Sequence, residues 1–229
     1  MTQTAARPEA VWTPSSEAPA GTLAHQLEGQ RHDYFIELAQ AGDIDLVFFG
    51  GTEAEMWWWP NRGRSVWDRA FGSIKAANFG SQGTHPESLL WRMRNGELDG
   101  YLAKLIVLQA GSNGEVVNDR AKFVESYAAV INEIRVRQPQ AKIVLFAPLP
   151  RGPTRETWQQ SAQARAAVFA ELVDDETVFY ADIGERFYLP DGSFNGASWS
   201  NDITNRGTQT SAYEIWAEAL QPWLDRYVR

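Results

Sequence analysis

Apolar residues along this chain fall into short continuous runs that alternate with longer stretches of helical periodicity. Short apolar runs are typical of buried parallel strands, and here they predict strands over residues 44–49, 74–79, 104–109, 142–147 and 177–181. Apolar residues three and four positions apart predict helices over residues 23–40, 87–94, 123–134, 157–172 and 211–223. Such alternation predicts an α/β fold, a three-layer α/β/α sandwich with a central parallel sheet of about five strands.

The first predicted strand breaks at Gly50 and Gly51, and a short helix over residues 53–59 is expected to follow. Ligands of open α/β sheets bind at the carboxyl ends of the strands, so we expect Thr52 to lie at the functional site. Further along, Thr84 and Glu87 have the spacing of a capping box that starts the next helix.

The composition favours one α/β domain. With 229 residues, we predict a single domain over residues 22–229 behind a flexible arm, residues 1–21, in which three prolines interrupt any helix. The 21 basic and 29 acidic residues argue against nucleic-acid binding. No apolar run approaches the ~20 residues of a membrane span, and no secretory signal is evident, so we expect a cytoplasmic protein that binds no membrane. With three histidines and no cysteine, we expect neither a metal nor another cofactor.

Four short segments form a set of motifs. They are residues 49–52 (Phe-Gly-Gly-Thr, followed by Glu55 and Trp57), 78–80 (Asn-Phe-Gly), 90–98 (Leu-Trp-Arg-Met-Arg-Asn-Gly-Glu-Leu) and 111–113 (Gly-Ser-Asn). Over residues 32–224 the chain resembles the SGNH (GDSL) hydrolases, in particular the branch like platelet-activating-factor acetylhydrolase. The resemblance implies a flavodoxin-like SGNH hydrolase fold. His32 resembles a histidine that lies outside the catalytic set of this family, and we interpret it as structural.

The resemblance also implies that the Ser-His-Asp triad is substituted. The first block of the family usually reads Gly-Asp-Ser, so Gly51 stands at the Asp and Thr52 at the nucleophilic Ser. A Thr hydroxyl needs a base just as Ser does.

The C-terminal Asp-x-x-His of the family has no full counterpart, because no histidine follows His85. In one register Asp202 keeps the acid and Asn205 replaces the histidine; in the other, Arg206 and Gln209 replace both. Neutral Asn and Gln side chains cannot act as a general base near pH 7.

The resemblance implies that the oxyanion donors are retained. Gly80 matches a glycine whose amide donates to the oxyanion, and Asn113 matches an asparagine whose side chain does the same. With the Thr52 amide, these groups are expected to bind a carbonyl or carboxylate oxygen. The set of expected substrate-binding residues is Gly51, Trp57, Gly80, Asn113, Asn205 and Gln209.

Three functions remain open. The first is an SGNH-fold protein that lacks the usual triad and binds or transforms a small acyl or glycosyl compound; a repurposed acid/base pair such as Glu53 with His85 is one form of this chemistry. The second is an active carboxylesterase or acyltransferase with Thr52 as nucleophile. The third is a partner-binding protein whose interface is the run of three tryptophans over residues 57–59. Chain pairing is common in such folds, so a homodimer also stays open.

Overall fold

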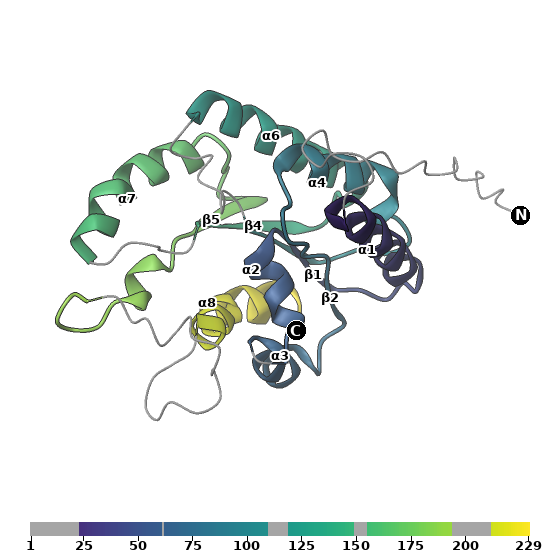
Figure 1. The fold of residues 1–229 in the computed structure, drawn as a ribbon, viewed down its shortest axis with the longest axis horizontal. Coiled ribbons are helices and arrows are strands. Elements are labelled where there is room, and N and C mark those ends of the chain that lie inside the picture. Colours follow the sequence, from purple (N-terminus) through teal and green to yellow (C-terminus); the bar gives the residue numbers. More distant parts are fainter. Residues whose placement is uncertain (1–22, 61, 110–118, 149–154, 194–211) are drawn as a thin grey trace, which may run out of the picture.

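A computed structural model describes residues 23–60, 62–109, 119–148, 155–193 and 212–229. Its centre is a five-stranded, wholly parallel sheet of order β2-β1-β3-β4-β5 (Figure 1). The strands are β1 (Leu46–Phe49), β2 (Ala76–Asn78), β3 (Leu105–Gln109), β4 (Lys142–Phe146) and β5 (Val178–Ala181). This is the flavodoxin-like order of doubly wound sheets, and it confirms the predicted fold class.

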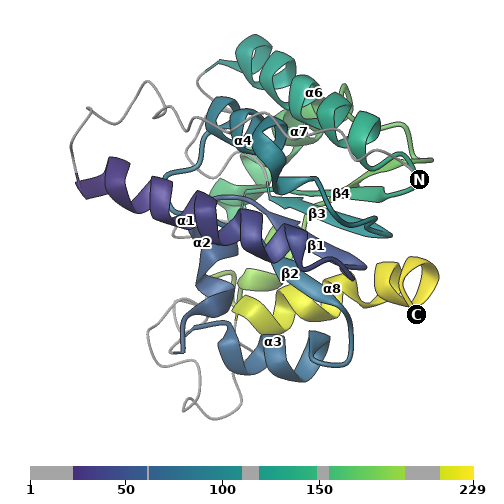
Figure 2. The same cartoon turned by 90° about the vertical axis from the view of Figure 1, so that its right-hand side faces the viewer.

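Helices cover both faces of the sheet (Figure 2). The face that carries Val47 and Phe49 shares one core with α1 (Leu23–Gln40), α4 (Pro86–Arg92), α6 (Arg120–Arg137) and α7 (Arg155–Phe169). The opposite face, with Leu46 and Phe48, packs on α3 (Arg64–Phe71) and α8 (Ala212–Tyr227). Successive strand residues point to opposite faces, so each buried strand contributes to both cores. The three-layer sandwich is therefore confirmed.

Short helical segments connect the main elements. They are α2 (Thr52–Glu55), η1 (Met56–Trp58), η2 (Met93–Glu97) and η3 (Gly184–Phe187). The η2 segment continues α4 as a π-helical turn, and it contains Gly96, whose φ of 112° lies in the left-handed region that glycine tolerates. The expected helix over residues 53–59 is thus α2 followed by η1.

The sequence-based prediction was wrong at the start of α4. We expected Thr84 to cap this helix, but the N-cap residue is His85, and its backbone amide donates to Ser88 Oγ at 3.1 Å. Pro86 explains the difference. A proline suits the first helical position, where no amide donor is needed, and it forces the preceding residue into an extended conformation. The Thr84 hydroxyl instead donates to the Ser81 carbonyl at 2.6 Å.

Helix α3 was not predicted at all. Its buried residues Val66, Trp67 and Phe71 belong to the core shared with α8, while the charged residues Asp68 and Arg69 lie between them in the sequence. Helix α8 includes Pro222 and continues beyond the predicted end at residue 223 to Tyr227. The predicted arm over residues 1–21 lies outside the described residues. In the part of the chain that is described, no helix is long and apolar enough to cross a membrane.

Candidate active site

The strand order places a topological switch point between β1 and β3. From β1 the chain moves to β2 on one side, and it then crosses to β3 on the other side. In sheets of this kind, ligands bind in the crevice at the carboxyl ends of the two strands that flank this point. Gly50, Gly51 and Thr52 directly follow β1, and Gln109 ends β3. We call this place the switch crevice.

Thr52 begins α2, and Gly51 is the N-cap residue. The Glu55 amide donates to the Gly51 carbonyl at 3.0 Å, which closes the turn of α2. The Thr52 side chain is half-buried, whereas Glu53, the next residue, is 6% exposed. The structure therefore places Thr52 and Glu53 together at the expected strand end.

Tyr213 connects α2 to α8. Its hydroxyl donates to the Glu53 carbonyl at 3.0 Å. Burial raises the pKa of the Tyr213 hydroxyl, and the nearby Glu53 carboxylate raises it further. The phenol is therefore protonated at neutral pH and has no capacity to act as a general base there.

Gly80 follows β2 and packs directly on α2. A Cβ at this position would lie 2.4 Å from the Glu55 backbone nitrogen, so only glycine fits. The Gly80 amide donates to Asn78 Oδ1 at 2.9 Å, and Asn78 Nδ2 donates to the Ala54 carbonyl at 2.8 Å. In this arrangement the amide expected to bind an oxyanion is already bonded to Asn78, a contact that the sequence did not reveal.

The carboxylate of Glu55 holds the loop after β2 against α2. It is 4% exposed and accepts a hydrogen bond from the Gln82 amide at 2.5 Å. Trp59 Nε1 donates to the same carboxylate at 3.2 Å, and Arg31 of α1 forms an ion pair with it. Glu55 thus joins three segments, and these contacts give it a structural role.

A second buried carboxylate, Glu97 of η2, anchors the same loop from the other side. Glu97 Oε1 lies 2.8 Å from His32 Nδ1 and accepts from Arg92 Nε at 2.8 Å. Arg92 also donates through Nη2 to the Phe79 carbonyl at 2.6 Å and through Nη1 to Thr84 Oγ1 at 3.1 Å. This network supports the interpretation of His32 as a structural residue.

Trp57 is a core residue, and its burial gives no support to its expected role in substrate binding. The side chain is fully buried. Its ring lies against Tyr213 and Trp216 of α8, with ring centroids 4.6 and 5.5 Å apart. Trp58 and Trp59 are half-buried, so the three tryptophans do not form the exposed patch that a partner-binding surface would need.

The remaining predicted residues are only partly placed. His85 sits at the N-cap of α4, after the loop that follows β2. Asn113, Asp202, Asn205 and Gln209 lie outside the described residues. Within the described ranges, no group of three or more His, Cys, Asp or Glu side chains is arranged to hold a metal ion.

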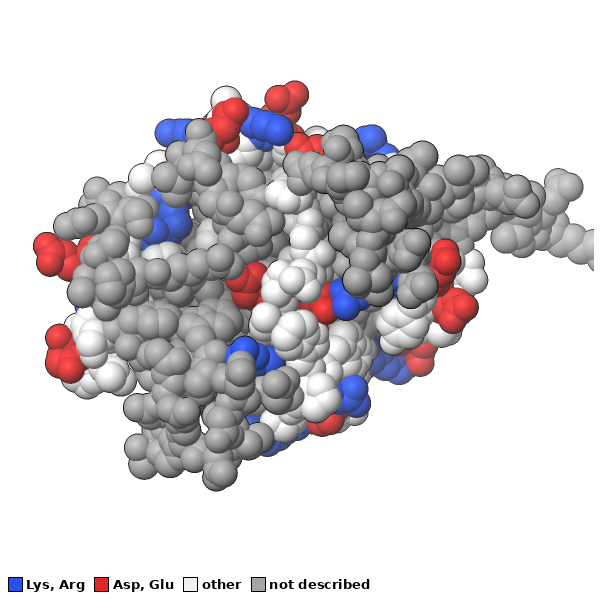
Figure 3. Space-filling model, in the orientation of Figure 1, with Lys and Arg blue, Asp and Glu red and all other residues white. Residues whose placement is uncertain are grey.

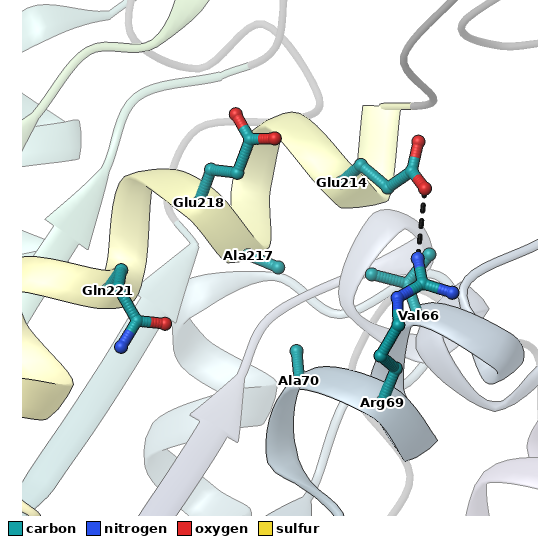
Figure 4. Close-up of a pocket in the computed structure, with 7 residues that line it drawn as sticks. All are labelled: Val66, Arg69, Ala70, Glu214, Ala217, Glu218 and Gln221. Atoms are coloured by element: carbon teal, nitrogen blue, oxygen red, sulfur yellow. Dashed lines mark hydrogen bonds and ion pairs between the residues drawn. The ribbon is translucent and has the colours of Figure 1, made fainter.

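A separate groove of about 410 Å³ lies between α3 and α8 (Figure 4). Arg69 of α3 points toward Glu214 of α8 across it, and Arg69 Nη2 donates to Glu214 Oε1 at 2.9 Å. None of the predicted site residues lines this groove. On the face of the molecule shown in Figure 3, the described acidic and basic side chains are interspersed.

The strand order and the covering helices define a flavodoxin-like α/β protein, and the Gly-Gly-Thr turn follows its first strand. Residues 46–221 match the model of the GDSL-like lipase/acylhydrolase family, so the chain belongs to this family, the SGNH/GDSL hydrolases. The human platelet-activating factor acetylhydrolase IB subunit alpha2 is 31% identical over 169 residues, which cover 72% of this chain and 70% of the human protein. The same subunit of Rattus norvegicus is 29% identical over the same shares.

Solved structures show the same fold. A protein from Streptococcus pneumonia superposes with a TM-score of 0.59 and 18% identity, covering 87% of this chain and 93% of that one. The periplasmic domain of a lipopolysaccharide acetyltransferase from Salmonella ser. Paratyphi A gives a TM-score of 0.53 at 11% identity, with 90% and 97% covered. At these identities the likeness concerns the fold alone.

Proposed function

We propose that this chain is a GDSL-family protein that does not hydrolyse esters by a Ser-His-Asp triad. In this proposal it binds or transforms a small acyl or glycosyl compound in the switch crevice. The observation that carries the proposal is the combination of Thr52 at the start of α2 with a sequence in which no histidine follows His85. A hydroxyl nucleophile requires a base to remove its proton.

The described ionisable groups around α2 support this proposal. His32 is buried against Glu97, and the Tyr213 phenol, which is protonated at neutral pH even at its ordinary pKa, is held further from ionisation because burial raises that pKa. Glu55 is engaged by Arg31, Gln82 and Trp59. These groups therefore serve the structure of the protein and are not available as a general base. We propose Glu53 and His85 as the pair from which any repurposed acid/base chemistry would come.

Ligand binding would depend on the donors near Thr52. We propose the Thr52 amide and the Asn113 side chain as the main donors to a carbonyl oxygen of the ligand. The Gly80 amide would join them only by giving up its bond to Asn78 Oδ1. We propose Asp202 as the remaining acid of the site and Asn205 and Gln209 as further ligand-binding residues.

Hydrolysis of a p-nitrophenyl ester series, from acetyl to octanoyl, tests the proposal. Wild type is compared with Thr52→Ala, Asn113→Ala and the conservative Thr52→Ser. We expect all four proteins to match the uncatalysed rate. Turnover by wild type that Thr52→Ala abolishes would overturn the proposal.

The alternative is an active carboxylesterase or acyltransferase with Thr52 as nucleophile. Membership in an acylhydrolase family and the position of Thr52 after β1 favour this function. It predicts that Thr52→Ser retains or increases turnover, since serine offers the same hydroxyl without the extra methyl group. The same ester series therefore separates the two functions.

A further inference from the structure

Gln109 is the last residue of β3 and the polar end of an otherwise apolar strand. Strand side chains alternate between faces, and Leu105 and Val107 belong to the core beneath α3 and α8. Gln109 therefore points to that same face, beside the turn that leads from β1 to Thr52. A Cβ added at Gly50 would lie 3.0 Å from both Cβ and Oε1 of Gln109. The carboxamide thus lies against the Gly50 turn, in the switch crevice.

Both polar atoms of this carboxamide are buried without a hydrogen-bond partner in the described part of the chain. Gln109 is 3% exposed, and neither Oε1 nor Nε2 bonds to any residue that the structure describes. Buried polar groups are bonded in the large majority of cases, because each group loses its water on burial. A donor and an acceptor left unsatisfied on one side chain destabilise the ligand-free protein. A ligand that bonds to both atoms would remove this cost.

The surroundings of Gln109 indicate the chemistry of that ligand. Its register partner on β4 is Phe146, and Gly50 and Ala54 lie beside it. These described neighbours provide no positive charge, so an anion would gain no counter-charge there. A carboxamide donates through Nε2 and accepts through Oε1, and it can therefore bond to a neutral group with an acceptor and a donor side by side. A primary carboxamide and the vicinal hydroxyls of a sugar both have this arrangement.

We propose that Gln109 is a ligand-binding residue of the switch crevice, and that it recognises a neutral group with adjacent hydrogen-bond donor and acceptor atoms. The inference rests on the proposed function, because it assigns a ligand class to the same crevice. Gly50 contributes to this binding site because it has no side chain. The missing side chain at this position leaves the space that the Gln109 carboxamide occupies.

The test uses NMR titration of the full-length ¹⁵N-labelled protein with three probes. Acetamide presents a primary carboxamide, methyl α-glucopyranoside presents vicinal hydroxyls, and sodium acetate is the anionic control. Gln109→Leu removes both polar atoms at similar volume and identifies the Gln109 side-chain NH₂ signals by their loss. The matched control makes the same substitution at an exposed glutamine, Gln140→Leu, in the loop before β4.

We expect acetamide or the glucoside, and not acetate, to shift the Gln109 NH₂ signals. The probe that does so identifies the source of the bonding group. Gln109→Leu should weaken this binding at least about tenfold, while its thermal midpoint stays equal to or above that of wild type. A purely structural glutamine would not combine lost binding with retained stability. Gln140→Leu should leave binding unchanged.

Equal affinity of wild type and Gln109→Leu would overturn the inference, as would a wild type that binds none of the neutral probes or binds acetate equally well. The failure of the proposed function has a different signature, namely ester turnover that depends on Thr52. An esterase whose probe binding still depends on Gln109 would therefore refute the proposed function and leave the binding role of Gln109 intact.

Discussion

The two sides of the switch crevice are built differently. On the β2 side, Asn78 bonds to both Ala54 and Gly80, and Arg92 bonds to the carbonyl of Phe79. On the β3 side, the Gln109 carboxamide is also buried but makes no hydrogen bond to the residues that the structure describes. The hydrogen bonds of the β2 side stabilise the folded protein. The β3 side keeps a buried carboxamide whose unmade hydrogen bonds destabilise the ligand-free protein, and groups of this kind are expected where a protein binds a ligand.

The largest loss of stability is expected from Arg92→Met, which changes the β2 side of the crevice. The substitution leaves Glu97 as a buried carboxylate without its main cation and removes two bonds to the loop after β2. We expect a loss of about 3–5 kcal/mol in the free energy of unfolding, measured by urea denaturation. The matched control is Arg94→Met, which removes an exposed arginine from Glu133 but leaves Glu133 paired with Arg137, and should cost no more than about 1 kcal/mol. Equal losses in both variants would contradict the structural role of the Arg92 network.

Gly80→Ala tests the close approach of the same loop to α2. The new Cβ would lie 2.4 Å from the Glu55 nitrogen and 2.5 Å from the Ala54 carbonyl carbon, both rigid backbone atoms. We expect destabilisation of about 3 kcal/mol, seen as a lower urea midpoint. The control is Gly83→Ala, where an added Cβ meets nothing within 4 Å and the cost, about 1–2 kcal/mol, comes only from a φ of 78°. A Gly80→Ala protein as stable as wild type would show that the loop does not pack on α2 in this way.

Asn78→Ala removes the two hydrogen bonds that connect β2, α2 and Gly80. Since it leaves the buried Ala54 carbonyl without this donor, we expect a loss of about 1–3 kcal/mol in thermal or urea unfolding. Asn132→Ala, on the exposed side of α6, serves as the control and should stay within about 0.5 kcal/mol of wild type. If the two variants behave alike, the β2 side is not stabilised as described.

The smallest change in the free energy of unfolding, and one of opposite sign, is expected for a substitution on the β3 side. Gln109→Leu replaces an unbonded carboxamide by an apolar side chain of similar size, so we expect stability to be unchanged or to rise by about 1 kcal/mol. Differential scanning calorimetry measures this change. A loss as large as that of Asn78→Ala would show that Gln109 is bonded in solution, and the contrast between the two sides would disappear.

Much of the fold could be predicted from local pattern. Continuous apolar runs marked the strands, and the break at Gly50 located the turn before Thr52. Helix α3 was missed although Trp67 and Phe71 have the four-residue spacing of one helix face, because a helix of eight residues gives only a short periodic pattern. The cap of α4 was misplaced because the geometry imposed by Pro86 outweighs the spacing of Thr84 and Glu87.

The candidate site was less predictable than the fold. The position of Thr52 followed from the strand end, but Trp57 was placed in the pocket although its partners on α8 bury it completely. The bond between Asn78 and the Gly80 amide depends on the packing of α2, which no spacing reveals. Gln109 did have a local signal, since it is the one polar residue of β3. Its missing partners become visible only in three dimensions.

The most direct test of the central claim is covalent labelling of the nucleophile position. The protein is incubated with a p-nitrophenyl phosphonate, which forms a stable adduct with activated hydroxyl nucleophiles, and the intact mass is measured. Because the proposal holds that Thr52 is not activated as a nucleophile, we predict no adduct on wild type or on Thr52→Ala, while a GDSL-family esterase with a complete triad is labelled under the same conditions. A stoichiometric adduct on wild type that is absent from Thr52→Ala would show an activated nucleophile and contradict the account.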